Sequence, residues 1–259
     1  MDLGLTDRTA IVCASSRGLG EACAHALARE GVRVFINGRN EAGLREAADR
    51  IERSVGSRPV PVVADIATED GRNRLVAACP DADILINNNA GPPPGKLDEW
   101  THDVWLTALE NNMLAPILLI RELLPGMRKR RFGRIVNITS AMVKSPMPKM
   151  GLSTAARTGL TALCKSISHE VAPDNVTINN LLPERIDTGR QRYMAERIMK
   201  EQNVSLEEAR QQIADTISAK RFGLPNEFAD ACAFLCSAQA GFISGQNLQL
   251  DGGSYHGLI

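Results

Sequence analysis

Two side chains that could act together chemically stand in the stretch GLSTAARTGLTALCKS, residues 151–166. Ser153 and Arg157 lie four positions apart, and because this stretch has a helical pattern they would share one face, one turn apart. A hydroxyl can hydrogen-bond a reacting oxygen, and a guanidinium can stabilise negative charge. The pair is either catalytic machinery or the place where such machinery once stood.

A second candidate site is the loop CASSRGLG (13–20), which follows an apolar strand and opens a helix. Gly18 and Gly20 allow a tight turn and a close approach of the helix N-terminus to a ligand, while Ser15, Ser16 and free amides supply donors for a pyrophosphate. A helix start capped by Ser16 would explain the serine but not the strand–glycine–helix context. The loop therefore predicts a phosphate site.

Apolar strands alternate with helical patterns along the chain. Strands are predicted over 8–15, 32–37, 60–65, 82–87, 133–140, 175–182 and 247–250, and helices over 18–31, 41–53, 68–79, 102–126, from the opening stretch to before Pro173, and 226–237. This alternation implies βαβ crossovers. We expect an α/β fold: a Rossmann-type doubly wound parallel sheet of about seven strands with helices on both faces.

Residues 1–259 read as a single dinucleotide-binding and catalytic domain, without linkers or repeats. The charged, mostly helical segment 187–223 interrupts the alternation of strands and helices. An insertion beyond the carboxyl end of a strand is where such folds place substrate-covering lids, so we expect a lid here. A solvated helical pair that touches no ligand is the alternative.

Composition excludes several function classes. Thirty basic residues balance thirty acidic ones, which argues against binding to nucleic acid or to a membrane surface. No apolar run is long enough to span a bilayer, and the N-terminus has no signal pattern. The six cysteines sit in apolar periodic stretches, where small buried hydrophobes are expected, and neither they nor the four histidines show metal-ligand spacing. We expect a cytoplasmic, metal-free protein.

Along nearly its whole length the chain resembles the short-chain dehydrogenase/reductase family. The family's first turn is Thr-Gly-x-x-x-Gly-x-Gly; this sequence keeps Gly18 and Gly20 but has Cys13 and Ala14 for Thr-Gly. Ala14 is expected to be tolerated at negative φ. Four further stretches carry the resemblance: VADIA (63–67), ILINNNAG (84–91), LLPERIDTG (181–189) and the C-terminal RFGLPNEFADACAFLCSAQAGFISGQNLQLDGG (221–253).

The resemblance implies a nicotinamide dinucleotide cofactor. Asp65 would lie at the adenine amino group and Thr188 would face the nicotinamide, with Glu184 replacing a family glycine. The strand-end asparagine is Asn87 counted from Ile84, or Asn88 counted back from Gly91. The cofactor-binding residues so implied are Ser15, Ser16, Arg17, Gly18, Leu19, Gly20, Arg39, Asp65, Ile66, Asn87, Asn88, Ala90, Arg157, Pro183, Ile186 and Thr188.

The end of the second strand, FINGRNE, bears on the choice of cofactor. An acidic residue there would bind the ribose diol of NAD(H), but Gly38 occupies the position and Arg39 follows it. Arg17 supplies a second cation, and arginine forks match phosphate. The pattern favours NADP(H) over NAD(H), unless both arginines are simply surface residues.

The family's chemistry uses a serine, a tyrosine, a lysine and an asparagine. By spacing, Ser140 holds the serine position, and Asn112, seven after Trp105, holds that of the asparagine. Counting thirteen on from Ser140 places Ser153 where tyrosine is expected, and Arg157 stands in the lysine position. A serine hydroxyl ionises far above the tyrosine pKa of about 10 and is a poor proton donor. Arg157 keeps the charge and can still grip the nicotinamide ribose.

Three functions remain open. The favoured one is an oxidoreductase that interconverts a keto and a hydroxy compound (a 3-oxoacyl thioester, sugar or polyol), taking its proton through Ser153, water or another acid; Lys144, Lys149 and Tyr193 are candidates. The second is a nucleotide-binding sensor or partner subunit without catalysis, and the third an enone reductase or dehydratase. The basic stretch GRQRYMAER (189–197) suggests either an anionic substrate group or a solvated face.

The resemblance also implies association into a homotetramer or dimer. Family members pair through the long helices after strands four and five and through the last strand. MLAPILLI (113–120) and the apolar C-terminus YHGLI are consistent with such pairing, although core burial explains the former equally well.

Overall fold

A computed structural model describes residues 1–258, so Ile259, the last residue of YHGLI, lies outside the described part. Seven parallel strands form one sheet with the order β3-β2-β1-β4-β5-β6-β7. The strands are β1 (Thr9–Val12), β2 (Arg33–Gly38), β3 (Val60–Val63), β4 (Ile84–Asn87), β5 (Gly133–Ile138), β6 (Val176–Pro183) and β7 (Asn247–Leu250). The predicted doubly wound α/β fold is confirmed.

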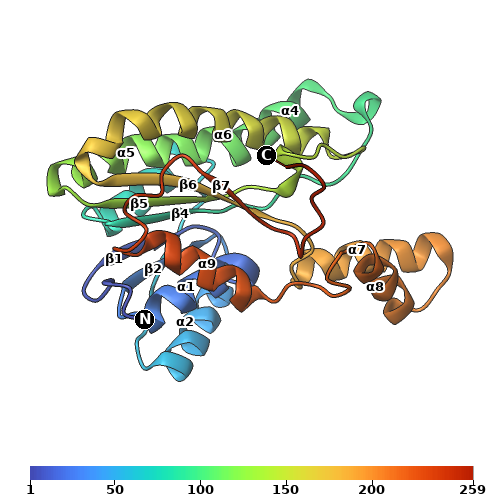
Figure 1. Cartoon of the computed structure of the whole chain (residues 1–259), viewed down its shortest axis with the longest axis horizontal. Coiled ribbons are helices and arrows are strands. Elements are labelled where there is room, and N and C mark those ends of the chain that lie inside the picture. Colours follow the sequence, from blue (N-terminus) through green and yellow to red (C-terminus); the bar gives the residue numbers. More distant parts are fainter. Residues whose placement is uncertain (259) are drawn as a thin grey trace.

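Helices cover both faces of the sheet (Figure 1). One face carries α1 (Gly18–Arg29), α2 (Glu41–Val55) and α9 (Pro225–Cys236); the other carries α3 (Glu69–Ala78), α5 (Ala115–Arg130) and α6 (Gly151–Val171), with α4 (His102–Leu109) packed against α6. Short 3-10 turns are η1 (Leu97–Glu99), η3 (Ala141–Val143) and η4 (Ala172–Asp174). Every residue of β4 and β5 is buried, as double coverage requires. All six cysteines are buried, as predicted.

The helix predicted over 102–126 is not continuous. A π-helical turn, η2 (Glu110–Leu114), separates α4 from α5. Pro116 explains the break, because it has no N–H to donate to the carbonyl of Asn112, four residues earlier. The hydrogen-bond ladder shifts locally to the wider π pattern, which often occurs at functional sites. Asn112 lies within this turn.

The chain order reverses at β1, which lies between β2 and β4. Loops leaving the carboxyl ends of these two halves run in opposite directions, and this divergence opens a crevice. Several strands end earlier than predicted: β1 stops at Val12 instead of 15, and β5 at Ile138 instead of 140. Of the residues freed from the sheet, Ala14, Thr139 and Ser140 line the crevice.

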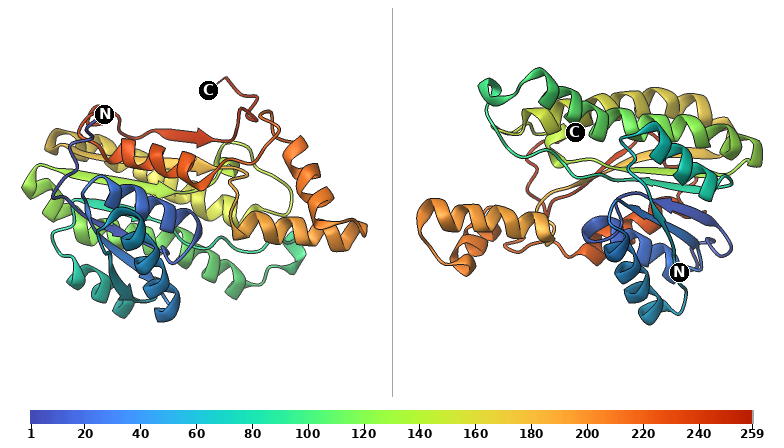
Figure 2. Two further views of the ribbon diagram at one scale, coloured as in Figure 1. Left: turned by 90° about the horizontal axis from the view of Figure 1, so that it is seen from below. Right: turned by 180° about the vertical axis from the view of Figure 1, so that it is seen from behind.

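The predicted insertion, 187–223, contains α7 (Gly189–Gln202) and α8 (Leu206–Asp215). Both helices project from the body of the molecule (Figures 1 and 2). They pack on each other around a small apolar cluster centred on Ala195, Ala209 and Ile213. Within residues 1–258, no helix has the length and apolarity that crossing a membrane would require.

Candidate active site

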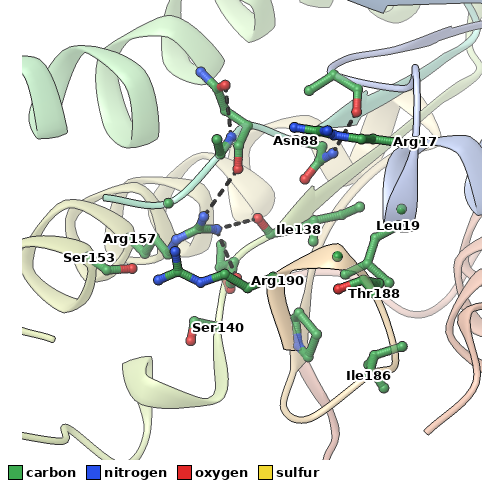
Figure 3. A pocket seen from close by; sticks show the side chains of 18 of the residues that line it. Arg17, Leu19, Asn88, Ile138, Ser140, Ser153, Arg157, Ile186, Thr188 and Arg190 are labelled. Atoms are coloured by element: carbon green, nitrogen blue, oxygen red, sulfur yellow. Dashed lines mark hydrogen bonds between the residues drawn. The ribbon is translucent and has the colours of Figure 1, made fainter. Parts of the chain in front are cut away.

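A cavity of about 710 Å³ lies at the carboxyl edge of the sheet, where the strand order reverses. Figure 3 shows side chains from both halves of the sheet and from α7 converging on it. Most predicted site residues line this cavity: Ser16, Arg17, Gly18, Leu19, Arg39, Asp65, Ile66, Asn88, Ala90, Ser140, Ser153, Arg157, Pro183, Ile186 and Thr188. Ser15, Gly20, Asn87 and Asn112 do not.

The backbone of the loop between β1 and α1 forms part of the cavity wall. Gly18 has φ 63°, a conformation that glycine adopts without strain. A Cβ on Gly20 would lie 2.4 Å from the carbonyl oxygen of Ala14, so only glycine fits there. Ser15 was expected to face the ligand, but its hydroxyl donates to the Val12 carbonyl at 2.7 Å and is buried. Its side chain holds the loop onto the sheet instead.

Ala14 departs from expectation. Its methyl group would be tolerated easily if the backbone there had negative φ, but its φ is 45°, in the left-handed region. The chain must turn sharply here, because the next amide, Ser15, donates to the Asn37 carbonyl on β2 at 2.8 Å. An alanine in this conformation carries strain that a glycine would not.

Replacing Ala14 with glycine should therefore stabilise the protein. We expect the free energy of unfolding to rise by about 1 kcal/mol, the usual cost of left-handed backbone for an L-residue, and Tm to rise by about 2–4 °C for a chain of this size. Ala22→Gly, within α1, is the matched control and should destabilise by about 1 kcal/mol. Equal losses in both variants would show that residue 14 bears no strain.

The end of β2 forms one end of the cavity. A Cβ on Gly38 would stand 3.7 Å from Ser16 Oγ and 3.5 Å from the Leu44 side chain, so nothing bulky fills this position. Arg39 Nη1 lies 3.8 Å from Asp65 Oδ2, and the arginine side chain is 76% exposed. Arg17 is also exposed. Two exposed arginines thus line the same cavity as a position that has no carboxylate of its own.

The strand pleat separates Asn87 from Asn88. Asn87 donates to Asn137 Oδ1 at 2.9 Å, Asn137 to Asn180 Oδ1 at 3.0 Å, and Asn180 to Asn247 Oδ1 at 2.8 Å, which forms a ladder across β4, β5, β6 and β7. Successive residues of a strand point to opposite sides. Asn88 therefore faces the cavity and donates to the Ala14 carbonyl at 3.1 Å. The structure does not bring the Asn87 side chain to the main cavity.

Arg157 joins the ends of two strands. Its Nη1 donates to the carbonyls of Ile138 (2.7 Å) and Thr139 (2.8 Å), and its Nη2 donates to Asn89 O at 3.4 Å (Figure 3). Burial, followed by the nearby charge of Arg190, lowers the pKa of Arg157 to about 10. The group remains protonated at neutral pH. It presents a buried positive charge beside Ser153, itself only 5% exposed.

Asn112 lies behind Arg157. A cavity of about 10 Å³, lined by Asn87, Asn112 and Arg157 among others, separates them. Asn87 Oδ1, Asn112 Oδ1 and Arg157 Nε have no hydrogen-bond partner among the described residues. The cavity has the volume of about one water molecule. Asn112 therefore adjoins the site from behind without lining the main cavity.

The expected alternative acids are placed differently. Lys149 is exposed and its carbonyl accepts from the Gly95 amide at 2.9 Å, while Lys144 Nζ lies 5.3 Å from the Tyr255 ring centre. Neither lysine lines the cavity, whereas Tyr193 does and is 44% exposed. Arg190 also lines the cavity. From the sequence it was considered only as part of the basic stretch 189–197 and was not named individually.

Comparisons with known proteins identify the family of this chain. A family model described as enoyl-(acyl carrier protein) reductase matches residues 13–255. The bovine (Bos taurus) dehydrogenase/reductase SDR family member 4 is 34% identical over 256 residues, which cover 96% of this chain and 88% of that protein. The chain belongs to the short-chain dehydrogenase/reductase family. It is accordingly an oxidoreductase that uses a nicotinamide cofactor.

Two further relatives resemble this short-chain dehydrogenase/reductase over almost their whole length. NADPH-dependent reductase BacG of Bacillus subtilis (strain 168) is 32% identical over 255 residues, which cover 96% of this chain and 98% of BacG. The structure of L-sorbose reductase from Gluconobacter frateurii, complexed with NADPH and L-sorbose, superposes with a TM-score of 0.95 at 30% identity and covers 100% of both chains.

Proposed function

We propose that this protein is an NADP(H)-dependent oxidoreductase that transfers a hydride between the nicotinamide and a keto or hydroxy substrate, with an active site that lacks the family's tyrosine and lysine. One observation carries the proposal: a single cavity extends from Arg17 and Arg39 to Ser140, Ser153 and Arg157. A dinucleotide placed along it would bring its nicotinamide to the three polar side chains.

The residues at the adenosine end fit NADP(H). Gly38 leaves open the place where a carboxylate would bind the ribose diol, and Arg17 and Arg39 line the same cavity. Arginine holds phosphate through forked, charge-assisted hydrogen bonds. Asp65 and Ile66 lie beside this end of the cavity, in position to contact the adenine.

The middle and far parts of the cavity fit the rest of the cofactor. Ser16, Gly18 and Leu19 at the start of α1 would hold the pyrophosphate, with Gly20 allowing the close approach. Asn88 and Ala90 follow β4. Pro183, Ile186 and Thr188 follow β6 and would position the nicotinamide.

At the substrate end the cofactor, when bound, supplies the hydride. Ser140 Oγ accepts from the Met142 amide at 3.3 Å, which leaves its own proton free to donate to a substrate oxygen. Arg157 was expected to hold the nicotinamide ribose, but its N–H groups are taken up by the carbonyls of Ile138, Thr139 and Asn89. Its positive charge would instead stabilise negative charge on the substrate oxygen, and Ser153 offers a second, weaker donor. Asn112 would support water-mediated proton supply through the small cavity behind Arg157.

The substrate class follows from these features and from the relatives. L-Sorbose reductase shares the fold over its full length, so a sugar or polyol is one candidate, with a 3-oxoacyl thioester as another. NADPH consumption by the purified protein should be measured against a carbonyl panel that includes both, with NADPH binding measured in parallel. Turnover of a carbonyl supports the proposal. Tight NADPH binding without turnover would contradict it and favour a sensor or partner subunit.

The cofactor preference has its own test. Replacing both Arg17 and Arg39 with alanine should weaken NADPH binding about 10²–10⁴-fold, because each of the two charged hydrogen bonds to the 2′-phosphate contributes about 1.5–3 kcal/mol. NADH binding should change little. Arg45→Ala, an exposed arginine on α2 paired with Glu41, is the control. Equal losses for NADPH and NADH would contradict the assignment.

We also propose that the protein pairs into dimers or tetramers through the faces its relatives' family uses. Large apolar side chains are exposed on α4, α6 and β7: Leu106, Leu163 and Leu248, at 51%, 37% and 41%. Isolated apolar side chains are common on surfaces, but these lie on elements that would meet in such an assembly. Light scattering that gave the mass of one chain would contradict the proposal.

A further inference from the structure

The substrate end of the cavity holds two cations with no carboxylate to balance them. Arg157 and Arg190 interact closely enough for the charge of Arg190 to lower the pKa of Arg157. Burial also lowers the pKa of Arg190. Within residues 1–258 neither guanidinium forms an ion pair. Positive charges that are partly removed from water and repel each other are costly unless an anion joins them.

Arg190 is the exception among the arginines of the lid, residues 187–223, because the other four form ion pairs. Each has an acidic partner: Arg192 with Glu196, Arg197 with Glu201, Arg210 with Asp187 and Arg221 with Glu227. The pairing of Arg210 with Asp187 uses both carboxylate oxygens, at 3.2 and 2.9 Å. Asp187, three residues before Arg190, is therefore already neutralised.

Two carboxyl groups line the cavity, and neither balances Arg190. Asp65 lies at the far, adenosine end beside Arg39. Glu184 is half-buried; burial and the charge of Asp251 raise its pKa, while Arg185 opposes the shift. Glu184 forms no ion pair within the described chain.

Arg190 is held so that its guanidinium reaches the reacting end. It lies in the first turn of the lid helix α7, and its Nη2 donates to the carbonyl of Pro92, in the loop after β4, at 3.2 Å. Figure 3 shows its side chain extending from the lid toward Arg157, Ser153 and Ser140. Pro92 accepts from one nitrogen only, so the other N–H groups remain available, and guanidinium offers five donors in a fork that fits a carboxylate.

We infer that Arg190 is a specificity-determining residue that binds a carboxylate on the substrate, so that the preferred substrates are oxo acids and the corresponding hydroxy acids. Arg157 contributes positive potential behind the bound group, while its own N–H groups stay on the strand-end carbonyls. Ser140 keeps its role at the carbonyl oxygen. This inference rests on the proposed function, whose chemistry it leaves unchanged.

The test combines a binding probe that cannot react with a matched set of substrates. Malonate and its neutral analogue dimethyl malonate are titrated calorimetrically into the protein, with and without NADP⁺. NADPH consumption is followed with 2-oxo and 3-oxo acids and with their methyl esters. Arg190→Gln is compared with Arg192→Gln, because Arg192 lies on the same helix, is 68% exposed and pairs with Glu196.

The wild type and Arg192→Gln should bind malonate but not its diester. Arg190→Gln should weaken malonate binding about tenfold to hundredfold, as expected for the loss of charged hydrogen bonds. It should raise KM for the acids by a similar factor, while kcat/KM for the esters and the Kd of NADPH stay unchanged.

Two results would overturn the inference. One is malonate binding that is absent, or equally strong in Arg190→Gln. The other is a loss of NADPH affinity in Arg190→Gln that matches the loss on the acids, which would assign Arg190 to the cofactor's phosphates. Failure of the proposed function looks different: malonate would bind in an Arg190-dependent way, but no carbonyl would be turned over.

Discussion

Ser140→Ala should lower kcat/KM for carbonyl reduction by about 10²–10³-fold, the usual effect of removing one donor from a developing oxyanion. Ser140 stands where β5 has just ended, and the Met142 amide occupies an acceptor position of its hydroxyl, so its proton is directed away from the backbone. Under the proposed assignment of Ser153 to the tyrosine position, few donors remain for the reacting oxygen, and each carries a larger share of the stabilisation.

The measurement is steady-state NADPH consumption, with NADPH binding determined separately by fluorescence. Binding should be unchanged, because Ser140 acts on the substrate oxygen and not on the cofactor. Ser145→Ala, an exposed serine on the same loop, should behave like the wild type. Full turnover in Ser140→Ala would remove Ser140 from the chemistry and leave Ser153 as the principal donor.

The double variant Ser153→Tyr/Arg157→Lys should raise kcat, by about 10²-fold at the low end of what a positioned general acid contributes. A phenol has a pKa of about 10 and donates a proton far more readily than an aliphatic hydroxyl. Ser153 and Arg157 lie one turn apart on α6 and both line the cavity, so a phenol and an ammonium introduced there would face the same space.

The same variant should be less stable than the wild type. Arg157 holds the carbonyls of Ile138, Thr139 and Asn89 together, and a lysine cannot reach all three. We expect the free energy of unfolding to fall by about 1–3 kcal/mol, the cost of leaving buried polar groups without a partner. Chemical denaturation measures this loss independently of activity.

Ser153→Phe/Arg157→Lys is the matched control for the gain in rate. It introduces the same ring and the same lysine but no hydroxyl, so it shares the loss of stability and should show no gain in kcat. A gain in both variants would mean that filling the site, and not proton donation, accelerates the reaction. No gain in either would indicate that the wild type already has an adequate proton source.

Local sequence patterns were enough to predict the fold of this protein. Short apolar runs separated by amphipathic helices predicted the order of strands and helices, because strands covered on both faces must be apolar throughout. The prediction of one continuous α-helix over 102–126 was wrong because of Pro116. A proline in the first turn of a helix is ordinary, and only the three-dimensional path shows that here a π-helical turn joins that first turn to the preceding helix.

Several site residues depended on side-chain direction, which the sequence left open. Asn87 and Asn88 are adjacent and identical in type, yet one belongs to a buried ladder and the other faces the cavity. Ser15 and Ser16 divide in the same way. A one-residue change of register exchanges the two sides of a strand, so the choice depends on how neighbouring strands pair.

The sequence by itself determined the sheet, its glycine-bearing phosphate loop, the absence of a carboxylate at Gly38 and the spacing that brings Ser153 and Arg157 to one helical face. These are local features, set by periodicity within an element or by the type of a single residue. Only the tertiary structure decided that Ala14 has positive φ and that Arg157 donates its hydrogen bonds to strand-end carbonyls. It also decided that Arg190 contacts Pro92, 98 residues away in the sequence. Such contacts depend on how distant segments pack, which no local pattern records.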